Sequence, residues 1–69
     1  MGYETLLYRY FIRQDNDQYL VVRDSWLWGL PVKFLNRYGE FTSVYHYFDN
    51  PTTAEIRLKK FLQNEGGLF

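Results

Sequence analysis

The sequence predicts a small α+β domain in which one C-terminal α-helix packs on a small antiparallel β-sheet of two hairpins and three to four strands. The first observation is that the stretch up to residue 48 alternates β-branched and aromatic runs with short polar turns. The second is a helical spacing of apolar residues after residue 51. The third is length: 69 residues provide interior for one core only, so residues 1–69 are expected to form a single compact domain.

The first expected hairpin begins with residues 3–13, whose apolar residues fit two periodicities. A helical stripe would use Tyr3, Leu6, Leu7, Tyr10 and Phe11, whereas one face of a strand would use Leu6, Tyr8, Tyr10 and Ile12. The content of tyrosine, phenylalanine and isoleucine favours a strand. The polar cluster Gln14–Asp17 and the β-branched run Tyr19–Arg23 follow, so the two runs are predicted to pair through a short turn.

The next segment connects the two expected hairpins. Residues 25–31 are apolar but contain Gly29 and Pro31, which favours a bend or an edge segment. Residues 32–38 have two interpretations. Pro31 before them and Gly39 after them suit a short helix, whereas Asn36 and Gly39 at the first and fourth positions are typical of a type I turn closed by a glycine bulge. Because Glu40–Phe48 is strongly β-like, we favour a second hairpin.

The C-terminal helix has the strongest local signals. Asp49-Asn50-Pro51 ends the preceding strand, and Thr52 with Glu55 forms a capping-box motif at the helix start. The apolar residues that share one face of this helix are Ala54, Leu58, Phe61 and Leu62. Ile56 lies opposite that stripe, and Gly66-Gly67 is expected to end the helix.

The predicted sheet carries more apolar surface than one helix can cover. A sheet with one solvated face should alternate apolar and polar residues, but the run 41–48 does not. As a strand it places Phe41, Tyr45 and Tyr47 on one face and Val44, His46 and Phe48 on the other. Two explanations have about equal weight: a curled sheet buries both faces on itself, or part of the surface is an interaction site.

Neither catalysis nor a cofactor or metal site is predicted. The chain has no cysteine, which excludes disulfides and thiolate metal sites. His46 is the only histidine and has no evident nucleophile near it in the sequence. Asp15-Asn16-Asp17 begins like a calcium loop, but Tyr19 and Leu20 stand where that loop requires Asp or Asn and then glycine. The expected class is a protein without enzymatic activity or cofactors.

Charge and hydropathy limit the expected class of binding partner and the expected cellular location. Eight Lys and Arg residues balance eight Asp and Glu residues, whereas a nucleic-acid binder normally has a basic excess, so nucleic acid is the second choice of partner. No apolar run approaches the roughly 18 residues of a membrane span. The N-terminus also lacks the features of a signal peptide. We therefore expect a cytoplasmic protein that does not bind a membrane.

The aromatic and arginine content predicts a protein-binding module. Aromatic residues make up 22% of the chain, and Tyr, Trp and Arg are the types most enriched at binding hot spots. Two tryptophans within one short connector are more than a core of this size readily buries. The predicted partner-binding residues are Arg9, Trp26, Trp28, Arg37, Tyr45 and Tyr47. The expected partner is a larger protein or protein complex, and a homodimer formed through an exposed strand edge is a further candidate.

In size and style the chain resembles the small inhibitors that phages make against bacterial enzymes and defence complexes, including the anti-CRISPR proteins. This resemblance implies a non-catalytic inhibitor. It rests on size and style, because no sequence motif carries it. The alternative function is nucleic-acid binding by aromatic residues on a sheet face. The residues that interleave in a compatible way are Arg9, Arg13, Arg23 and Arg37 with Tyr8, Tyr10, Phe11 and Tyr38. The Asn36–Phe41 hairpin and the Thr52–Phe61 helix are similar in layout to the arm-type DNA-binding domains of phage integrases, which are usually basic, unlike this chain.

Overall fold

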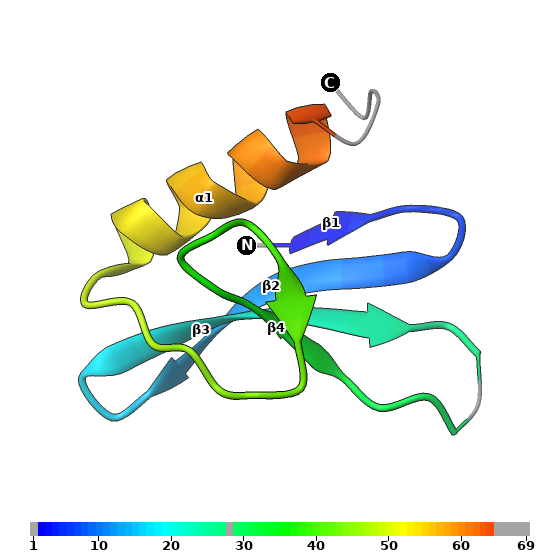
Figure 1. Cartoon of the computed structure of the whole chain (residues 1–69), viewed down its shortest axis with the longest axis horizontal. Helices are drawn as coiled ribbons and strands as arrows, with labels where there is room; N and C mark the ends of the chain where they lie inside the picture. The colour runs from blue at the N-terminus through cyan, green and yellow to red at the C-terminus, as the bar shows by residue number, and fades with distance from the viewer. Residues whose placement is uncertain (1, 28, 65–69) are drawn as a thin grey trace.

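The computed structural model describes residues 2–27 and 29–64 and has one antiparallel sheet with one helix across it (Figure 1). The sheet has five strands in sequence order, each paired with the next. The elements are β1 (Gly2–Glu4), β2 (Tyr8–Asp15), β3 (Gln18–Ser25), β4 (Lys33–Leu35), β5 (Phe41–Thr42) and α1 (Pro51–Asn64). The predicted α+β class with a C-terminal helix is confirmed, and the sheet has five strands instead of three to four.

The extra strand arises because the single strand predicted over residues 3–13 is divided by a turn. Thr5 makes this turn: its hydroxyl accepts a hydrogen bond from the Tyr8 N–H at 3.0 Å, and its own N–H donates to the Tyr8 carbonyl at 2.8 Å. A Thr side chain that bonds the nearby backbone competes with the strand ladder. Leu6 and Leu7 therefore lie at the tip of a hairpin between β1 and β2, and Leu6 is not on the strand face where the alternation placed it.

The two predicted turns are present where the sequence signals them. Asp15 pairs with Gln18 across the β2–β3 hairpin, and Asn16 between them has φ 58°, a conformation that Asn tolerates well. In the β4–β5 hairpin, the side-chain oxygen of Asn36 accepts hydrogen bonds from two backbone N–H groups, those of residues 38 and 40, at 2.9 and 3.0 Å. Gly39 has φ 82°, as the glycine bulge requires. The hairpin interpretation of residues 32–38 is therefore correct, and the short helix is not formed.

The strand predicted over residues 40–48 is wrong beyond Thr42. The Thr42 hydroxyl accepts a hydrogen bond from the Val44 N–H, and the chain bends at Ser43 and Val44. It rejoins the sheet only at Phe48, which forms an isolated bridge with Tyr19 through two backbone hydrogen bonds of 2.8 and 2.9 Å. High β-propensity did not produce a strand here because residues 43–47 have no neighbouring strand with which to pair.

The helix begins one residue before the predicted capping box. Asn50 caps it: its side-chain oxygen accepts a hydrogen bond from the Thr53 N–H at 2.8 Å, and its carbonyl accepts one from the Ala54 N–H at 3.3 Å. Pro51 is the first helical residue, where its missing N–H costs nothing and its fixed φ suits the helix. Thr52 is exposed within the first turn and is not the cap. The predicted stop at Gly66-Gly67 lies outside the described residues.

Replacing Asn50 with alanine is expected to lower the free energy of unfolding by about 1 kcal/mol, since it removes the side-chain partner of an otherwise unbonded helix N–H. Thr52→Ala is the matched control and should change stability by less than about 0.5 kcal/mol, because Thr52 is exposed and makes no capping bond. Urea denaturation followed by circular dichroism measures both. If Thr52→Ala were the more destabilising change, the capping box would be the true helix start.

The helix packs its predicted apolar stripe on one face of the sheet. Ala54, Leu58 and Leu62 are fully or almost fully buried, and Phe61 at the margin is half-buried. The sheet and connector residues of this core are Tyr10, Val21, Leu35 and Phe48. Phe41 meets Phe61 edge to face at 4.8 Å between ring centroids, an arrangement that aromatic quadrupoles favour. Ile56 on the opposite side of the helix is 59% exposed.

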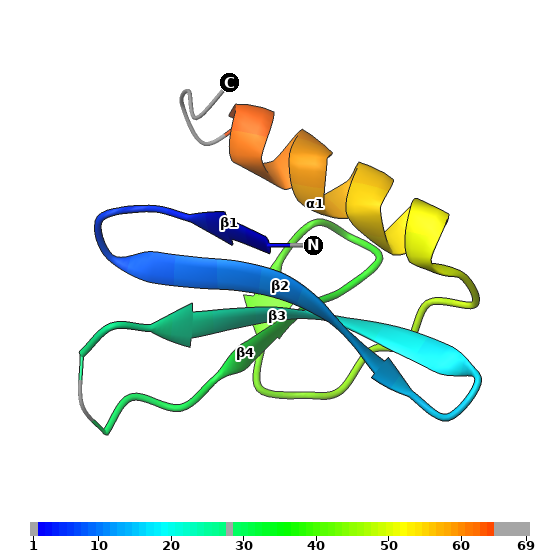
Figure 2. The same ribbon diagram turned by 180° about the vertical axis from the view of Figure 1, so that it is seen from behind.

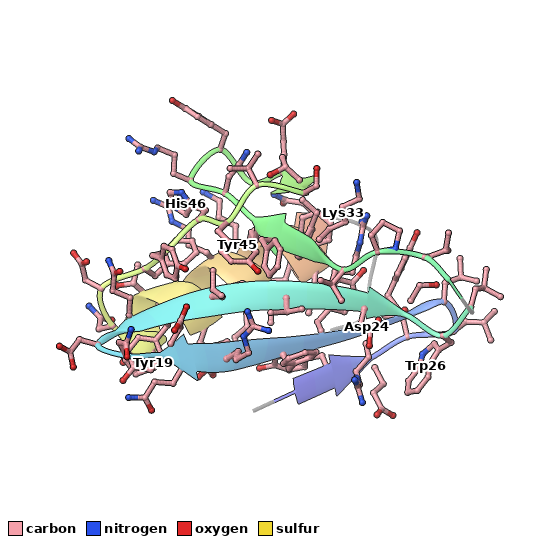
Figure 3. The ribbon with its side chains drawn as sticks, turned by 90° about the horizontal axis from the view of Figure 1, so that it is seen from below. Tyr19, Asp24, Trp26, Lys33, Tyr45 and His46 are labelled. Atoms are coloured by element: carbon pink, nitrogen blue, oxygen red, sulfur yellow. The ribbon has the colours of Figure 1, made fainter. Side chains whose placement is uncertain are left out.

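A second, smaller core covers the other face of the sheet. Leu20, Val22 and Phe34 are buried there, with Phe11 and Tyr47 packed at the margin. The segment between β5 and α1 covers this core. Its Tyr45 ring lies edge-on to Phe34, with 4.6 Å between the ring centroids. Figure 3 shows Tyr45 beside β3 and β4, with α1 behind the sheet. The Tyr47 hydroxyl donates a 3.1 Å hydrogen bond to the Asp15 carboxylate. Part of the aromatic surplus is therefore core, because the chain folds back over its own sheet.

Candidate functional site

Two loops that are distant in sequence meet at one end of the sheet and expose a group of large apolar side chains. They are the β1–β2 turn and the connection from β3 to β4, which lie at the same end in Figures 1 and 2. Trp26 joins them: its backbone N–H donates to the Leu7 carbonyl at 3.2 Å, and its indole N–H donates to the Thr5 carbonyl at 3.1 Å. We call this surface the apolar loop end and define it by Leu6, Leu7, Trp26, Leu27 and Leu30.

The exposure of the apolar loop end distinguishes it from ordinary surface. Its five side chains are between 50% and 92% exposed, with Leu6 at the upper limit. Single exposed apolar residues are normal in folded proteins, but several large ones gathered on two adjoining loops are typical of an interaction site. The two Trp26 hydrogen bonds hold the β1–β2 turn against the start of the β3–β4 connection.

Arg9 lies beside this surface. Its guanidinium forms a 3.1 Å ion pair with Asp24 across the β2–β3 pair. The same guanidinium lies 5.7 Å from the Trp26 ring centroid and 5.2 Å from that of Phe11. An exposed ion pair adds little to stability, so its main effect is to hold the guanidinium between two aromatic rings. Arg9 and Trp26 are thus two predicted partner-binding residues that the structure brings together at this end of the sheet.

The other four predicted residues lie elsewhere or are not described. Tyr45 is 57% exposed over the second core, where it is also 6.2 Å from Tyr47. The hydrogen bond that Tyr47 donates to the Asp15 carboxylate raises the pKa of Tyr47, with burial as the second cause. Arg37 is on the β4–β5 turn, 5.9 Å from the Tyr38 ring centroid. Trp28 lies outside the described residues. Of the five predicted residues that the structure describes, Tyr45, Tyr47 and Arg37 therefore do not share a surface with Arg9 and Trp26.

Sequence reasoning missed the four leucines of the apolar loop end. The sequence pattern places Leu6 and Leu7 in a continuous strand. It identifies residues 25–31 as apolar but does not predict which other segment lies beside them. The available signal was local: two consecutive leucines after Thr5 interrupt the alternation that a strand requires. Thr5 is a residue type that makes side-chain-supported turns. The pairing of this turn with Trp26 could not be read in the same way, because it joins residues 21 positions apart.

His46 is the one histidine, and its surroundings do not favour the charged form. Its ring lies edge-on to Phe48 at 4.9 Å between centroids. Partial burial lowers the pKa of His46 below its ordinary value of 6.5, and the nearby Arg37 charge lowers it further. Above pH 6.5 this imposes no cost on folding. As the pH falls from 6.5 through the lowered pKa, the unfolded chain takes up the proton first, and stability is lost.

A nuclear magnetic resonance titration of the His46 ring protons should therefore give a pKa below 6.5. In Arg37→Gln the pKa should rise part of the way toward 6.5 and no further, because burial is the larger cause. Lys59→Gln should leave the value unchanged, because Lys59 is an exposed helix residue whose charge does not act on His46. A full return to 6.5 in Arg37→Gln would instead make charge repulsion the main cause.

Among the residues that the structure describes, acidic side chains and helix length speak to metal binding and membrane insertion. No group of three or more His, Asp or Glu side chains among these residues could hold a metal ion. No helix in residues 2–27 and 29–64 is long and apolar enough to cross a bilayer. The Asp15–Asp17 tip carries one carboxylate that is engaged by Tyr47.

Fold and site together define a small α+β domain with a two-sided aromatic core and an exposed apolar loop end. Comparison of the chain with protein-family models, curated proteins and solved structures found no match.

Proposed function

We propose that this chain is a non-catalytic protein-binding module that docks its apolar loop end, with Arg9 at the margin, onto a larger protein or protein complex. The observation that carries the proposal is the gathering of Leu6, Leu7, Trp26, Leu27 and Leu30 on two loops held together by Trp26. Burying each of these side chains against a partner would contribute about 1 to 2 kcal/mol in proportion to the area removed from water.

The chemistry of the surface supports a protein as the occupant. Tryptophan and arginine are the residue types that most often carry binding energy at protein interfaces, and here they adjoin each other at the centre and margin of the patch. The Arg9–Asp24 ion pair provides donors and acceptors for a polar rim around the apolar centre. The two Trp26 hydrogen bonds restrain the β1–β2 turn, and such preorganisation reduces the entropy lost on binding.

The manner of action that fits this proposal is inhibition by occupation of a surface. A small domain with a fixed apolar end can block a site on a larger enzyme or defence complex without chemistry of its own. This is the mode of the phage-encoded inhibitors that the chain resembles in size and style.

Trp26→Ala is expected to weaken partner binding by 2 kcal/mol or more, about thirtyfold, because truncating a central interface aromatic has this effect. Leu27→Ser, at a side chain 62% exposed, should also weaken binding while leaving the fold intact. The matched control is Ile56→Ser, since Ile56 is equally exposed but lies on the outer face of α1. Affinity capture from the native host with quantitative mass spectrometry would identify the partner, and titration with the purified partner would give the affinities.

The result that contradicts the proposal is a partner bound equally by wild type, Leu27→Ser and Trp26→Ala, with folding verified by circular dichroism. Analytical ultracentrifugation distinguishes docking onto another protein from self-association of this chain. If Leu27→Ser converted a dimer of the chain alone into a monomer, the apolar loop end would be the interface of a homodimer instead.

A further inference from the structure

A basic groove lies between the β4–β5 turn and the C-terminal half of α1, where the turn approaches the helix in Figure 1. Its cavity volume is about 220 Å³. The lining residues that matter here are Arg37, Tyr38, Arg57, Lys60, Phe61 and Asn64. Four of these six residues come from the helix, where residues 57, 60, 61 and 64 share one side because they are three or four positions apart. The Asn36 side chain shapes the turn that supplies the other side.

The groove concentrates positive charge in a chain whose formal net charge is zero. Neither ion pair among the described residues involves its three cations: those pairs join Arg9 to Asp24 and Lys59 to Glu55. Glu40 belongs to the same turn, but it does not line the groove. The bridge between Tyr19 and Phe48 instead brings the acidic β2–β3 tip near Asp49, which precedes α1.

The groove also has an exposed aromatic ring and a rigid floor. Tyr38 is 79% exposed, and the Arg37 guanidinium lies 5.9 Å from its ring centroid. Phe61 is held from below by its edge-to-face contact with Phe41. A cation next to an exposed aromatic ring matches the two parts of a nucleotide, the phosphate and the base. The lowered pKa of His46 is consistent with the positive field of Arg37 nearby.

We propose that the basic groove binds the phosphate backbone of a single-stranded nucleic acid and that Tyr38 stacks on an unpaired base. A volume of about 220 Å³ is below the range of roughly 300 to 1,000 Å³ that encloses a whole small ligand. A strand that passes through an open groove needs no enclosure. A single strand is required because base pairs inside a duplex do not offer a free face to Tyr38. This site shares no residue with the apolar loop end, so it is independent of the protein-binding proposal.

Fluorescence anisotropy with a labelled oligothymidylate of about ten nucleotides tests the proposal with the full chain. Three phosphates neutralised by Arg37, Arg57 and Lys60 should give a slope of about −2 for log affinity against log salt concentration. Arg57→Gln and Lys60→Gln should each reduce the steepness of that slope by about 0.7. Arg13→Gln is the matched control, since it removes the same charge from an exposed position on β2 outside the groove, and it should leave the slope unchanged.

The stacking contribution is tested separately at Tyr38. Tyr38→Ala should weaken binding about tenfold, whereas Tyr38→Phe should retain the affinity, because phenylalanine keeps the ring face. A matched DNA duplex should bind at least several-fold more weakly than the single strand. Because Tyr38 is highly exposed, loss of folding is not an expected outcome of either substitution.

Several outcomes would overturn the proposal. One is the absence of binding at low salt, and another is an Arg13→Gln effect equal to that of Arg57→Gln. Equal affinity for the duplex and the single strand would contradict the stacking of an unpaired base. An equal loss of affinity in Tyr38→Phe and Tyr38→Ala would contradict it as well. Competition by a polyglutamate peptide at the same concentration as the oligonucleotide would point to an acidic protein segment and against nucleic acid. None of these outcomes bears on the apolar loop end, which the Leu27→Ser and Trp26→Ala variants test independently.

Discussion

Leu58→Ala is expected to lower the free energy of unfolding by about 3 kcal/mol. Leu58 is fully buried at the centre of the helix stripe, between Ala54 and Leu62, in the core that α1 forms with the sheet. Truncation removes the apolar transfer energy and leaves a cavity that the rigid strands cannot close. A domain of 69 residues has a total stability of only about 3 to 10 kcal/mol, so this loss would be from about a third to all of it.

Ile56→Ala is the matched control for this helix prediction. It removes a similar volume from the same helix, but Ile56 is 59% exposed, so stability should change by less than about 0.5 kcal/mol. Urea denaturation followed by circular dichroism and tryptophan fluorescence measures both variants. Equal effects at Leu58 and Ile56 would mean that the helix is not docked through its predicted stripe.

Phe34→Ala is expected to cost about 3 kcal/mol as well, on the opposite face of the sheet. Phe34 is only 3% exposed and belongs to the smaller core with Leu20 and Val22. A sheet covered by a single helix ordinarily has one solvated face. If this face were solvated, truncation at Phe34 would change the free energy of unfolding little. The size of the loss therefore measures how well the segment between β5 and α1 covers the second face.

Tyr45→Ala provides the comparison for the second core. Tyr45 contacts Phe34 edge to face but is 57% exposed, so its truncation should cost about 1 kcal/mol, the contribution of an aromatic pair. The double variant should cost less than the sum of the two single losses, because the pair interaction is lost only once. Strict additivity would show that Tyr45 does not pack on Phe34 in solution.

These two cores also limit where partners can bind. The faces of the sheet are occupied by α1 on one side and by the 43–48 segment around Phe34 on the other. The apolar loop end and the basic groove share no lining residue and differ in chemistry. A protein partner and a nucleic acid could therefore be bound at the same time.

The sequence by itself determined the elements whose signals are local. The stripe of Ala54, Leu58 and Leu62 predicted both the helix and its buried face. Asn36 and Gly39 predicted a turn because the bonds that form it join residues at most four positions apart. The start of α1 was misplaced for a related reason: two capping signals overlap, and Pro51 lets Asn50 act as the cap before Thr52 can.

Only the tertiary structure decided which β-like segments became strands and where the exposed apolar surface lies. Residues 43–47 have strand composition but no strand beside them, and a strand is stable only through its partner. They cover Phe34 instead, which turns part of the aromatic surplus into core. The apolar loop end exists because Trp26 bonds to Thr5 and Leu7 across the sheet. Such pairings depend on the register of β2 and β3, and no local pattern along the chain encodes the resulting surface.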